Sequence, residues 1–159
     1  MRMAYSETFD AGNADASANA SMYPVSTGAG ELRKERRDRP IGVLIVDDHE
    51  LVRRGLRALL AANPGVFEIC GEAASGHEAV KKARHLRPDV VVLDVSMPGL
   101  NGLDAAREIR QGRSRAKILM LSQHDPAQLL PRAIQAGAQA CVDKSRLGAD
   151  LLPAIEKVA

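Results

Sequence analysis

The chain has 159 residues, of which 45% are hydrophobic and 26% are charged, a composition typical of a globular domain. Its 22 basic and 20 acidic residues leave a formal net charge of +2, which gives no electrostatic footprint for nucleic acid. No apolar run is long enough to span a membrane, and the first forty or so residues lack the apolar core of a signal peptide. We therefore expect a cytoplasmic protein that does not act at a membrane.

Residues 1–39 differ in composition from the rest of the chain. Most of this segment is rich in alanine, serine, asparagine and glycine and shows no hydrophobic period, so it cannot bury enough surface to offset the entropy of ordering. Its end, 31–39, is mostly basic, which favours a solvated linker or short helix over a nucleic-acid or membrane-surface patch. We predict a disordered tail with a basic linker over 1–39 and one folded domain over 40–159.

From residue 41 onward, apolar runs alternate with stretches of helical periodicity. The clearest strand is 90–93, a continuous run of valine and leucine bounded by Pro88 and a later proline-glycine turn, as in a strand buried on both faces. The clearest helix start is Ser75, because Glu78 stands at capping-box spacing. Strands are predicted over 43–46, 66–70, 90–93, 117–121 and 139–142, and helices over 49–62, 75–86, 102–110, 126–136 and 147–158. This alternation predicts an α/β fold of the doubly wound (βα)5 type, a five-stranded parallel sheet with helices on both faces.

Polar side chains stand directly or soon after the ends of four of the predicted strands. Asp47 and Asp48 follow the first strand, Asp94 the third, Ser122 the fourth, and Lys144 comes soon after the fifth. The carboxyl ends of parallel strands meet at one edge of a sheet, so we expect these side chains to converge. Three carboxylates in one pocket repel each other, and a hard divalent cation such as Mg²⁺ relieves that repulsion. A lysine and a hydroxyl beside them suit a small dianion such as phosphate.

Each of these residues also has a local alternative. Asp94 could cap a turn, Asp48 could cap the first helix, and Lys144 could be a solvated lysine at a strand end. The four histidines of the chain show no mutual spacing of metal ligands, and we expect them on the surface. Cys70 and Cys141 form no CxxC pair, which favours free buried thiols over a disulfide or a metal site.

Taken together, the order and spacing of these motifs resemble the receiver domain of two-component response regulators, in particular receivers of the NarL/FixJ type. The matching stretches are VLIVDDHELVRRGL, VVVLDVSMPGLNGLD, ILMLS and AGAQACVDKS, within residues 41 to about 158. The resemblance implies the flavodoxin-like strand order 2-1-3-4-5. It also implies a role in phosphorelay signal transduction in a bacterium.

The resemblance assigns a role to each candidate site residue. Asp94 corresponds to the phosphoacceptor, which takes a phosphoryl group from a phosphohistidine on a sensor histidine kinase. Asp48, Asp94 and the backbone carbonyl of Ser96 would bind Mg²⁺, and Asp47 would help through water. Lys144 and Ser122 would contact the phosphoryl oxygens. Such a domain is not an enzyme, apart from Mg²⁺-dependent self-phosphorylation and autodephosphorylation.

Two positions depart from the family pattern. Cys141 stands where receivers usually carry an aromatic residue that turns inward on phosphorylation, and Pro131 lies inside the predicted helix 126–136, where a kink is expected. Both lie on the face that receivers commonly use for partners. We therefore expect intact chemistry with an unusual output face, and a phosphorylation-independent interaction module is the alternative. An enzyme or flavin protein of this architecture is disfavoured, because no glycine-rich phosphate loop follows the first strand.

The output of the domain is a separate question. Full-length NarL/FixJ regulators carry a C-terminal helix-turn-helix domain, and no second helical pattern follows residue 158. We expect either a stand-alone receiver or a fragment of a longer regulator, with protein contacts or a transcriptional output supplied elsewhere. We do not expect these residues to bind DNA themselves, and the sequence leaves a homodimer open.

Overall fold

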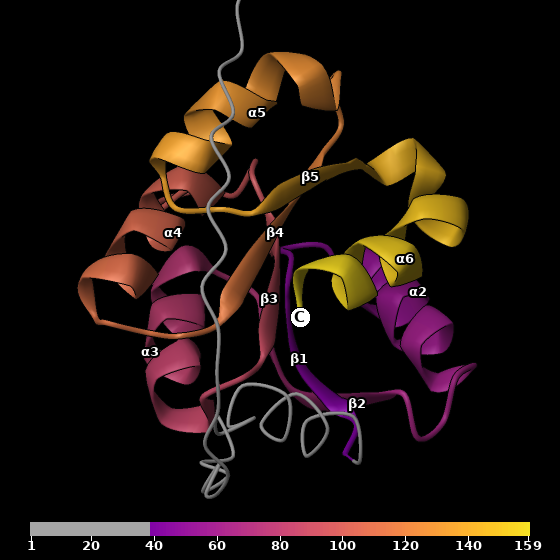
Figure 1. The fold of residues 1–159 in the computed structure, drawn as a ribbon. Helices are drawn as coiled ribbons and strands as arrows, with labels where there is room; N and C mark the ends of the chain where they lie inside the picture. Colours follow the sequence, from indigo (N-terminus) through magenta and orange to yellow (C-terminus); the bar gives the residue numbers. More distant parts are fainter. Residues whose placement is uncertain (1–38) are drawn as a thin grey trace, which may run out of the picture.

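The computed structural model describes residues 39–159, in which strands and helices alternate (Figure 1). The elements are β1 (Ile41–Val46), α2 (Glu50–Ala61), β2 (Phe67–Ala73), α3 (Gly76–Leu86), β3 (Val90–Asp94), α4 (Gly102–Gln111), β4 (Lys117–Ser122), α5 (Pro126–Gln135), β5 (Ala140–Asp143) and α6 (Leu147–Val158). All five strands and five helices predicted from the sequence are present. The predicted tail over 1–39 lies, except for its last residue, outside the described residues.

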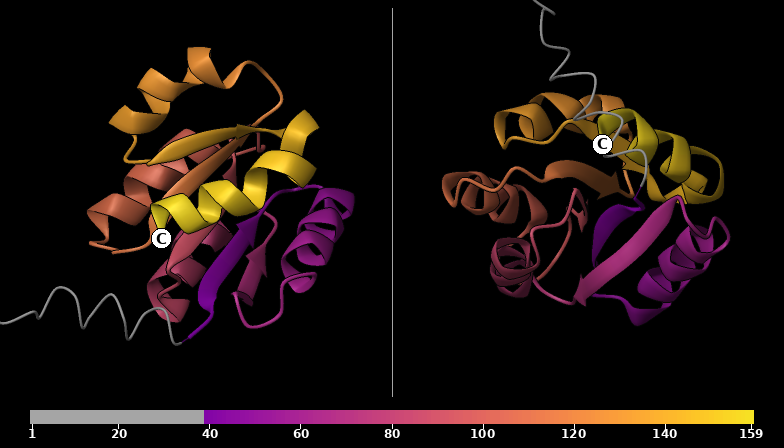
Figure 2. Two further views of the ribbon diagram at one scale, coloured as in Figure 1. Left: turned by 45° about the vertical axis from the view of Figure 1, so that its right-hand side comes forward. Right: turned by 60° about the horizontal axis from the view of Figure 1, so that its bottom comes forward.

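The strands form one parallel sheet in the order β2-β1-β3-β4-β5. Helices α3, α4 and α5 cover one face, and α2 and α6 cover the other, as Figure 1 and the two views of Figure 2 show. The predicted doubly wound fold and strand order are confirmed. Because all strands run in one direction, their carboxyl ends lie on a single edge, which the site occupies.

The core is aliphatic and divided by the sheet into two halves. Successive side chains of a strand point to opposite faces. Leu44 and Val46 thus pack with α3, α4 and α5, whereas Val43 and Ile45 pack with α2 and α6. Every residue of β3 is buried, as are all but the first residues of β1 and β4. Burial on both faces is why these strands are continuous apolar runs in the sequence.

Several strand boundaries differ from the prediction, most of all the end of β2 and the start of β1 at Ile41, and one short turn was missed. β2 continues to Ala73 rather than ending at Cys70, because backbone pairing with β1 persists through the polar stretch as far as Val46–Ala73. Cys70 is the extra residue of a bulge in this edge strand, where the register shifts between Ile69 and Gly71. β5 is shifted by one residue, and a 3₁₀ turn over Lys144–Arg146 precedes α6.

Two of the predicted helix starts, those of α3 and α4, are confirmed by their cap hydrogen bonds. The Ser75 hydroxyl accepts from the Glu78 amide at 3.2 Å, and the Asn101 side chain accepts from the Asp104 amide at 3.0 Å. The Glu78 carboxylate bonds the amide of Ala74, one residue before the expected capping-box partner. These caps satisfy amides that the first helical turn leaves free.

Cys70 and Cys141 are free, as expected, and both are half-buried. They lie in β2 and β5, the two opposite edge strands of the sheet, so they cannot pair within one chain. Burial raises the pKa of both thiols. Within residues 39–159, no helix combines the length and the apolar character needed to cross a membrane.

Candidate functional site

The carboxyl edge of the sheet gathers the side chains that the sequence pointed to. Asp47 directly follows β1, Asp94 ends β3 and Ser122 ends β4, and the three are 0%, 1% and 4% exposed. Among residues 39–159, no other polar or charged residue is buried to this degree. Since a buried charge is costly without a partner, the contacts of these groups define the site.

Lys144 bridges the two buried carboxylates. Its Nζ lies 2.7 Å from Oδ2 of Asp47 and 3.0 Å from Oδ1 of Asp94, and its side chain is only 9% exposed. The alternative of a solvated lysine is therefore wrong. Two negative charges share one positive charge at the bottom of the site, so part of the carboxylate repulsion is relieved by the chain itself.

The ionisation of the pair follows from this geometry. Burial raises the pKa of the Asp94 carboxyl above its ordinary value, although Lys144 and the amide of Ser96 oppose the shift. Burial alone would lower the pKa of the Lys144 ammonium, but its contacts with Asp47 and Asp94 outweigh that effect and raise the pKa. Lys144 is consequently a fixed positive charge at neutral pH, placed against the carboxylate of Asp94.

Two carboxylate oxygens of the site accept no hydrogen bond. Within the described residues these are Oδ1 of Asp48 and Oδ2 of Asp94, both buried, and the former also lies 3.0 Å from Nδ1 of His49. One ligand atom from each of Asp47, Asp48, His49 and Asp94 lies within 4.8 Å of the others. Anionic oxygens gathered in this way fit a hard divalent cation such as Mg²⁺. The acidic pocket of the fold is thus present and chemically suited to the predicted metal.

His49 is a neighbour of the site to which the sequence analysis gave no role. Its side chain is 60% exposed, as expected for a surface histidine, but its Nδ1 lies 3.0 Å from Oδ1 of Asp48 and 3.3 Å from Oδ1 of Asp47. Its backbone amide also donates to Oδ1 of Asp47 at 2.8 Å. His49 is the N-cap of α2, which has no side-chain cap, so the alternative of Asp48 as a helix cap is wrong.

Arg53 is a second residue that the sequence analysis missed. Its Nη1 donates to the backbone carbonyl of Asp47 at 2.7 Å, and its Nε donates to Glu72 of β2 at 3.2 Å. The guanidinium thereby fixes the turn between β1 and α2 that presents Asp47. The sequence did offer a signal for this role, because Arg53 stands one helical turn after His49, on the face of α2 directed at the sheet.

Ser122 and Ser96 lie at the site but do not contact Lys144 through a hydrogen bond among the described residues. The Ser122 hydroxyl accepts from the amide of His124 at 3.0 Å, and among the described residues it makes no hydrogen bond to Asp94 or Lys144. Ser96 is exposed, and its amide donates to Oδ1 of Asp94 at 3.2 Å. Ser122 is buried next to the site, since Asp94 pairs with Leu121 in the register of β3 and β4, whereas Ser96 lies at its exposed rim.

Gly102 lets α4 begin directly against the backbone of the phosphoacceptor candidate. A Cβ on Gly102 would collide with the carbonyl oxygen of Asp94 and lie 2.8 Å from Cα of Val95. The amide of Gly102 donates to the Val95 carbonyl at 2.9 Å. This close packing fixes the main chain on which the Asp94 side chain is carried.

This arrangement, a doubly wound sheet whose carboxyl edge holds a lysine-bridged aspartate beside an acidic pocket, defines a class of signalling domain. The chain matches the family model described as the response regulator receiver domain over residues 43–156, and it belongs to this family. The domain is therefore part of two-component phosphorelay signalling. Receiver domains of this family are generally not enzymes.

Individual relatives agree with this assignment. The chain is 42% identical over 118 residues to the response regulator UvrY of Escherichia coli, covering 74% of this chain and 54% of UvrY. A two-component response regulator of the LuxR family from Aurantimonas sp. has a similar structure, with a TM-score of 0.70 and 39% identity, over 75% of this chain and 84% of that one. The CheX–CheY–BeF3–Mg²⁺ complex from Borrelia burgdorferi matches at a TM-score of 0.69 and 30% identity, over 76% and 90%. The chain spans about half the length of the curated relatives it matches.

Proposed function

We propose that this receiver is a phosphorylation switch in which Asp94 accepts a phosphoryl group from the phosphohistidine of a sensor histidine kinase. The observation that carries the proposal is the state of the Asp94 carboxylate. One of its oxygens is held by Lys144 and the Ser96 amide, and the other is buried with no partner in the described residues. A carboxylate positioned in this way is a ready nucleophile with a preorganised charge beside it.

The proposed transfer is a displacement at phosphorus. An oxygen of Asp94 forms the new bond to phosphorus, and the bond from phosphorus to the histidine nitrogen of the donor breaks, so the imidazole leaves. The ammonium of Lys144, 3.0 Å from Oδ1 of Asp94, is placed to pair with the phosphoryl oxygens. The Ser122 hydroxyl is the acceptor in its bond with the His124 amide, so its O–H can donate to the same group without losing that bond.

The metal partner proposed for this site is Mg²⁺, held by Asp48, Asp94 and the backbone carbonyl of Ser96, with Asp47 acting through water. The buried oxygens of Asp48 and Asp94 that accept no hydrogen bond within the described residues support this ligand set. When bound, Mg²⁺ supplies positive charge that offsets the charge of the phosphoryl oxygens. The similar CheY complex contains both BeF3 and Mg²⁺, which supports the same pair of ligands here.

The response is proposed to be a change in protein contacts or a transcriptional output supplied elsewhere. The relatives that the chain matches over about half their length are response regulators, which supports an output beyond this domain. We propose that the switch acts in the cytoplasm, because its kinase donor uses ATP. The proposal includes a phosphorylation-dependent homodimer. It does not include direct DNA binding by these residues.

A phosphorylation-independent interaction module is the second candidate, and Cys141 is the observation that favours it. Cys141 is half-buried in β5 and packs against the core beneath α5, where the resemblance would place an aromatic switch residue. A small side chain cannot make the same large rotamer change. Pro131 lies inside α5 and leaves the Ala127 carbonyl without its usual helical donor, and the predicted kink stays a prediction.

The test is intact-mass analysis after incubation with acetyl phosphate and Mg²⁺. A phosphoryl adduct is expected on the wild type and not on Asp94→Asn, and it should be lost when EDTA replaces Mg²⁺. The matched control is Asp125→Asn, because Asp125 is an exposed aspartate that caps α5 outside the acidic pocket. If no adduct forms under any condition, the interaction module becomes the better account.

A further inference from the structure

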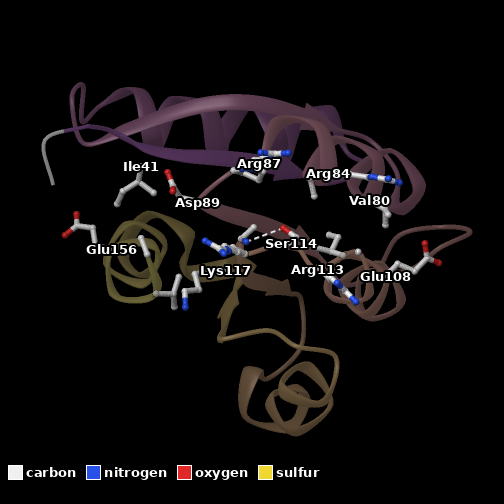
Figure 3. Close-up of a pocket in the computed structure, with 18 of the residues that line it drawn as sticks. Ile41, Val80, Arg84, Arg87, Asp89, Glu108, Arg113, Ser114, Lys117 and Glu156 are labelled. Carbon is white, nitrogen blue, oxygen red and sulfur yellow. Dashed lines mark hydrogen bonds between the residues drawn. The ribbon is translucent and has the colours of Figure 1, made fainter. Parts of the chain in front are cut away.

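The edge of the sheet opposite Asp94 carries a large groove that none of the chemistry above uses. The cavity has a volume of about 1340 Å³ and lies where α3, α4 and α6 end, beside the start of β4. Figure 3 shows Arg84 and Arg87 along one side of it and Arg113 and Lys117 along the other. We call it the basic groove, because seven cationic and only three anionic side chains line it.

Six of the seven cations of the basic groove lack a paired counter-charge among the described residues. Arg39 is neutralised by both oxygens of Asp89, at 2.9 and 3.0 Å. Within residues 39–159, the other six make no ion pair and no side-chain hydrogen bond: Arg84, Arg87, Arg113, Arg115, Lys117 and Lys157. In the same range most cations outside the groove are paired with a carboxylate, for example Arg53, Arg57 and Arg146. An uncompensated set of like charges around a hollow is the arrangement expected of an anion site.

Favourable helix dipoles explain only part of this charge. A cation near a helix C-terminus is stabilised by the dipole, and three helices end here. However, the backbone of Arg87 and Arg113 is left-handed, with φ of 49° and 57°. This conformation favours glycine, and asparagine after it, over a long side chain. Arginine therefore occupies two positions that local backbone preference would give to glycine, and both guanidinium groups line the groove.

The chemistry of the lining favours a phosphorylated organic molecule. Guanidinium groups bind phosphate oxygens in pairs of parallel hydrogen bonds, and cations from both walls can share several phosphates. Between them the groove is also lined by the half-buried apolar side chains of Ile41 and Val80, which suit a flat organic group. The carboxylates of Glu108 and Glu156 also line it and oppose binding, so an anion with several charges is needed to profit from the excess of cations.

From this groove we infer a second binding site in this protein, one for a nucleoside di- or triphosphate. A concave site with a mixed apolar and cationic lining fits such a ligand better than a nucleic acid strand, which binds extended basic surfaces. The net charge of +2 for the whole chain also disfavours a general nucleic-acid surface. The site is at the opposite edge of the sheet from Asp94, so binding does not depend on the phosphorylation chemistry.

The test is a two-dimensional ¹H–¹⁵N NMR titration of the full chain with ATP in EDTA, which keeps metal away from the acidic pocket. Saturable shifts are expected in the amides of residues 84–87 and 113–117. The double variant R84Q/R113Q should bind about tenfold more weakly or worse, because two charge-assisted contacts are lost. The matched control is R54Q/R132Q, which changes two exposed helix arginines outside the groove and should alter the affinity by less than about twofold.

Further probes identify the ligand class. Adenosine should not bind, and inorganic tripolyphosphate should bind more weakly than ATP, because it lacks the organic group. The proposal would be overturned if both double variants bound ATP equally well. It would also be overturned if the shifts centred on Asp94 and Lys144, or if no saturable shift appeared. Tripolyphosphate binding as tightly as ATP would also overturn it. If a short single-stranded oligonucleotide bound more tightly than ATP, with shifts spread beyond the groove, the ligand would be a nucleic acid and not a nucleotide.

Discussion

Replacing Gly102 by alanine is the most sensitive test of how the fold positions Asp94. The added Cβ would collide with the carbonyl oxygen of Asp94 and lie 2.8 Å from Cα of Val95, and both are backbone atoms that cannot rotate away. Overpacking of this kind costs about 1–3 kcal/mol, and the gain in helix propensity returns at most about 1 kcal/mol. We expect a net loss of roughly 2 kcal/mol of stability together with a slower reaction at Asp94.

The same substitution at Gly55 supplies the control. Gly55 lies in the middle of α2, and its added Cβ would meet no atom within 4 Å. Alanine there should stabilise the protein by about 0.5–1 kcal/mol through helix propensity alone. Urea unfolding followed by circular dichroism, with acetyl phosphate labelling of both variants, measures the two effects. Equal or greater stability of Gly102→Ala relative to wild type would refute the close packing of α4 on the Asp94 backbone.

Three further predictions concern the ion pair, the metal pocket and the thiols. Lys144→Met leaves two buried carboxylates without their shared cation, so urea unfolding in EDTA should show a loss of about 3 kcal/mol, partly recovered with Mg²⁺; unchanged stability in EDTA would contradict the bridge. His49→Ala should weaken Ni²⁺ binding about tenfold in calorimetry and leave Mg²⁺ binding nearly unchanged, because the His49 imidazole lies within the ligand cluster and suits Ni²⁺, whereas Mg²⁺ prefers oxygen ligands; an equal loss for both metals would argue against imidazole as a ligand of Ni²⁺. In a Cys70→Ser background, Cys141 should react with a disulfide reagent more slowly than in urea, and its rate should keep rising with pH past the range of a free thiol, because burial raises its pKa; reaction at the unfolded rate would show that the thiol is accessible.

Most of the fold could be predicted because its signals are local. Strands β1, β3 and β4 are buried on both faces, so their residues are apolar without interruption. The edge strand β2 was placed too short, because its last residues include Glu72, which faces polar partners on α2 rather than the core. An edge strand is held by backbone pairing on one side, and a polar residue there leaves no apolar signal.

The candidate site, too, could be predicted from the sequence only in part. Asp47, Asp94 and Lys144 could be brought together from the sequence, because each stands at or just beyond the end of a strand in a parallel sheet. The contacts of His49 and Arg53 with Asp47 depend on the angle at which α2 leaves the sheet, which residue order does not specify. The basic groove is less visible still, since its arginines come from the last turn of α3 and from connections that lie far apart in the chain.

The central claim is that the phosphoryl group resides on Asp94, and reductive trapping tests it most directly. Borohydride reduces an acyl phosphate to an alcohol, which converts a phosphorylated aspartate to homoserine and leaves other aspartates unchanged. After treatment with acetyl phosphate and Mg²⁺, peptide mass spectrometry should find homoserine at position 94 and aspartate at positions 47 and 48. Homoserine at another position, or at none while the intact protein carries a phosphoryl adduct, would contradict the account.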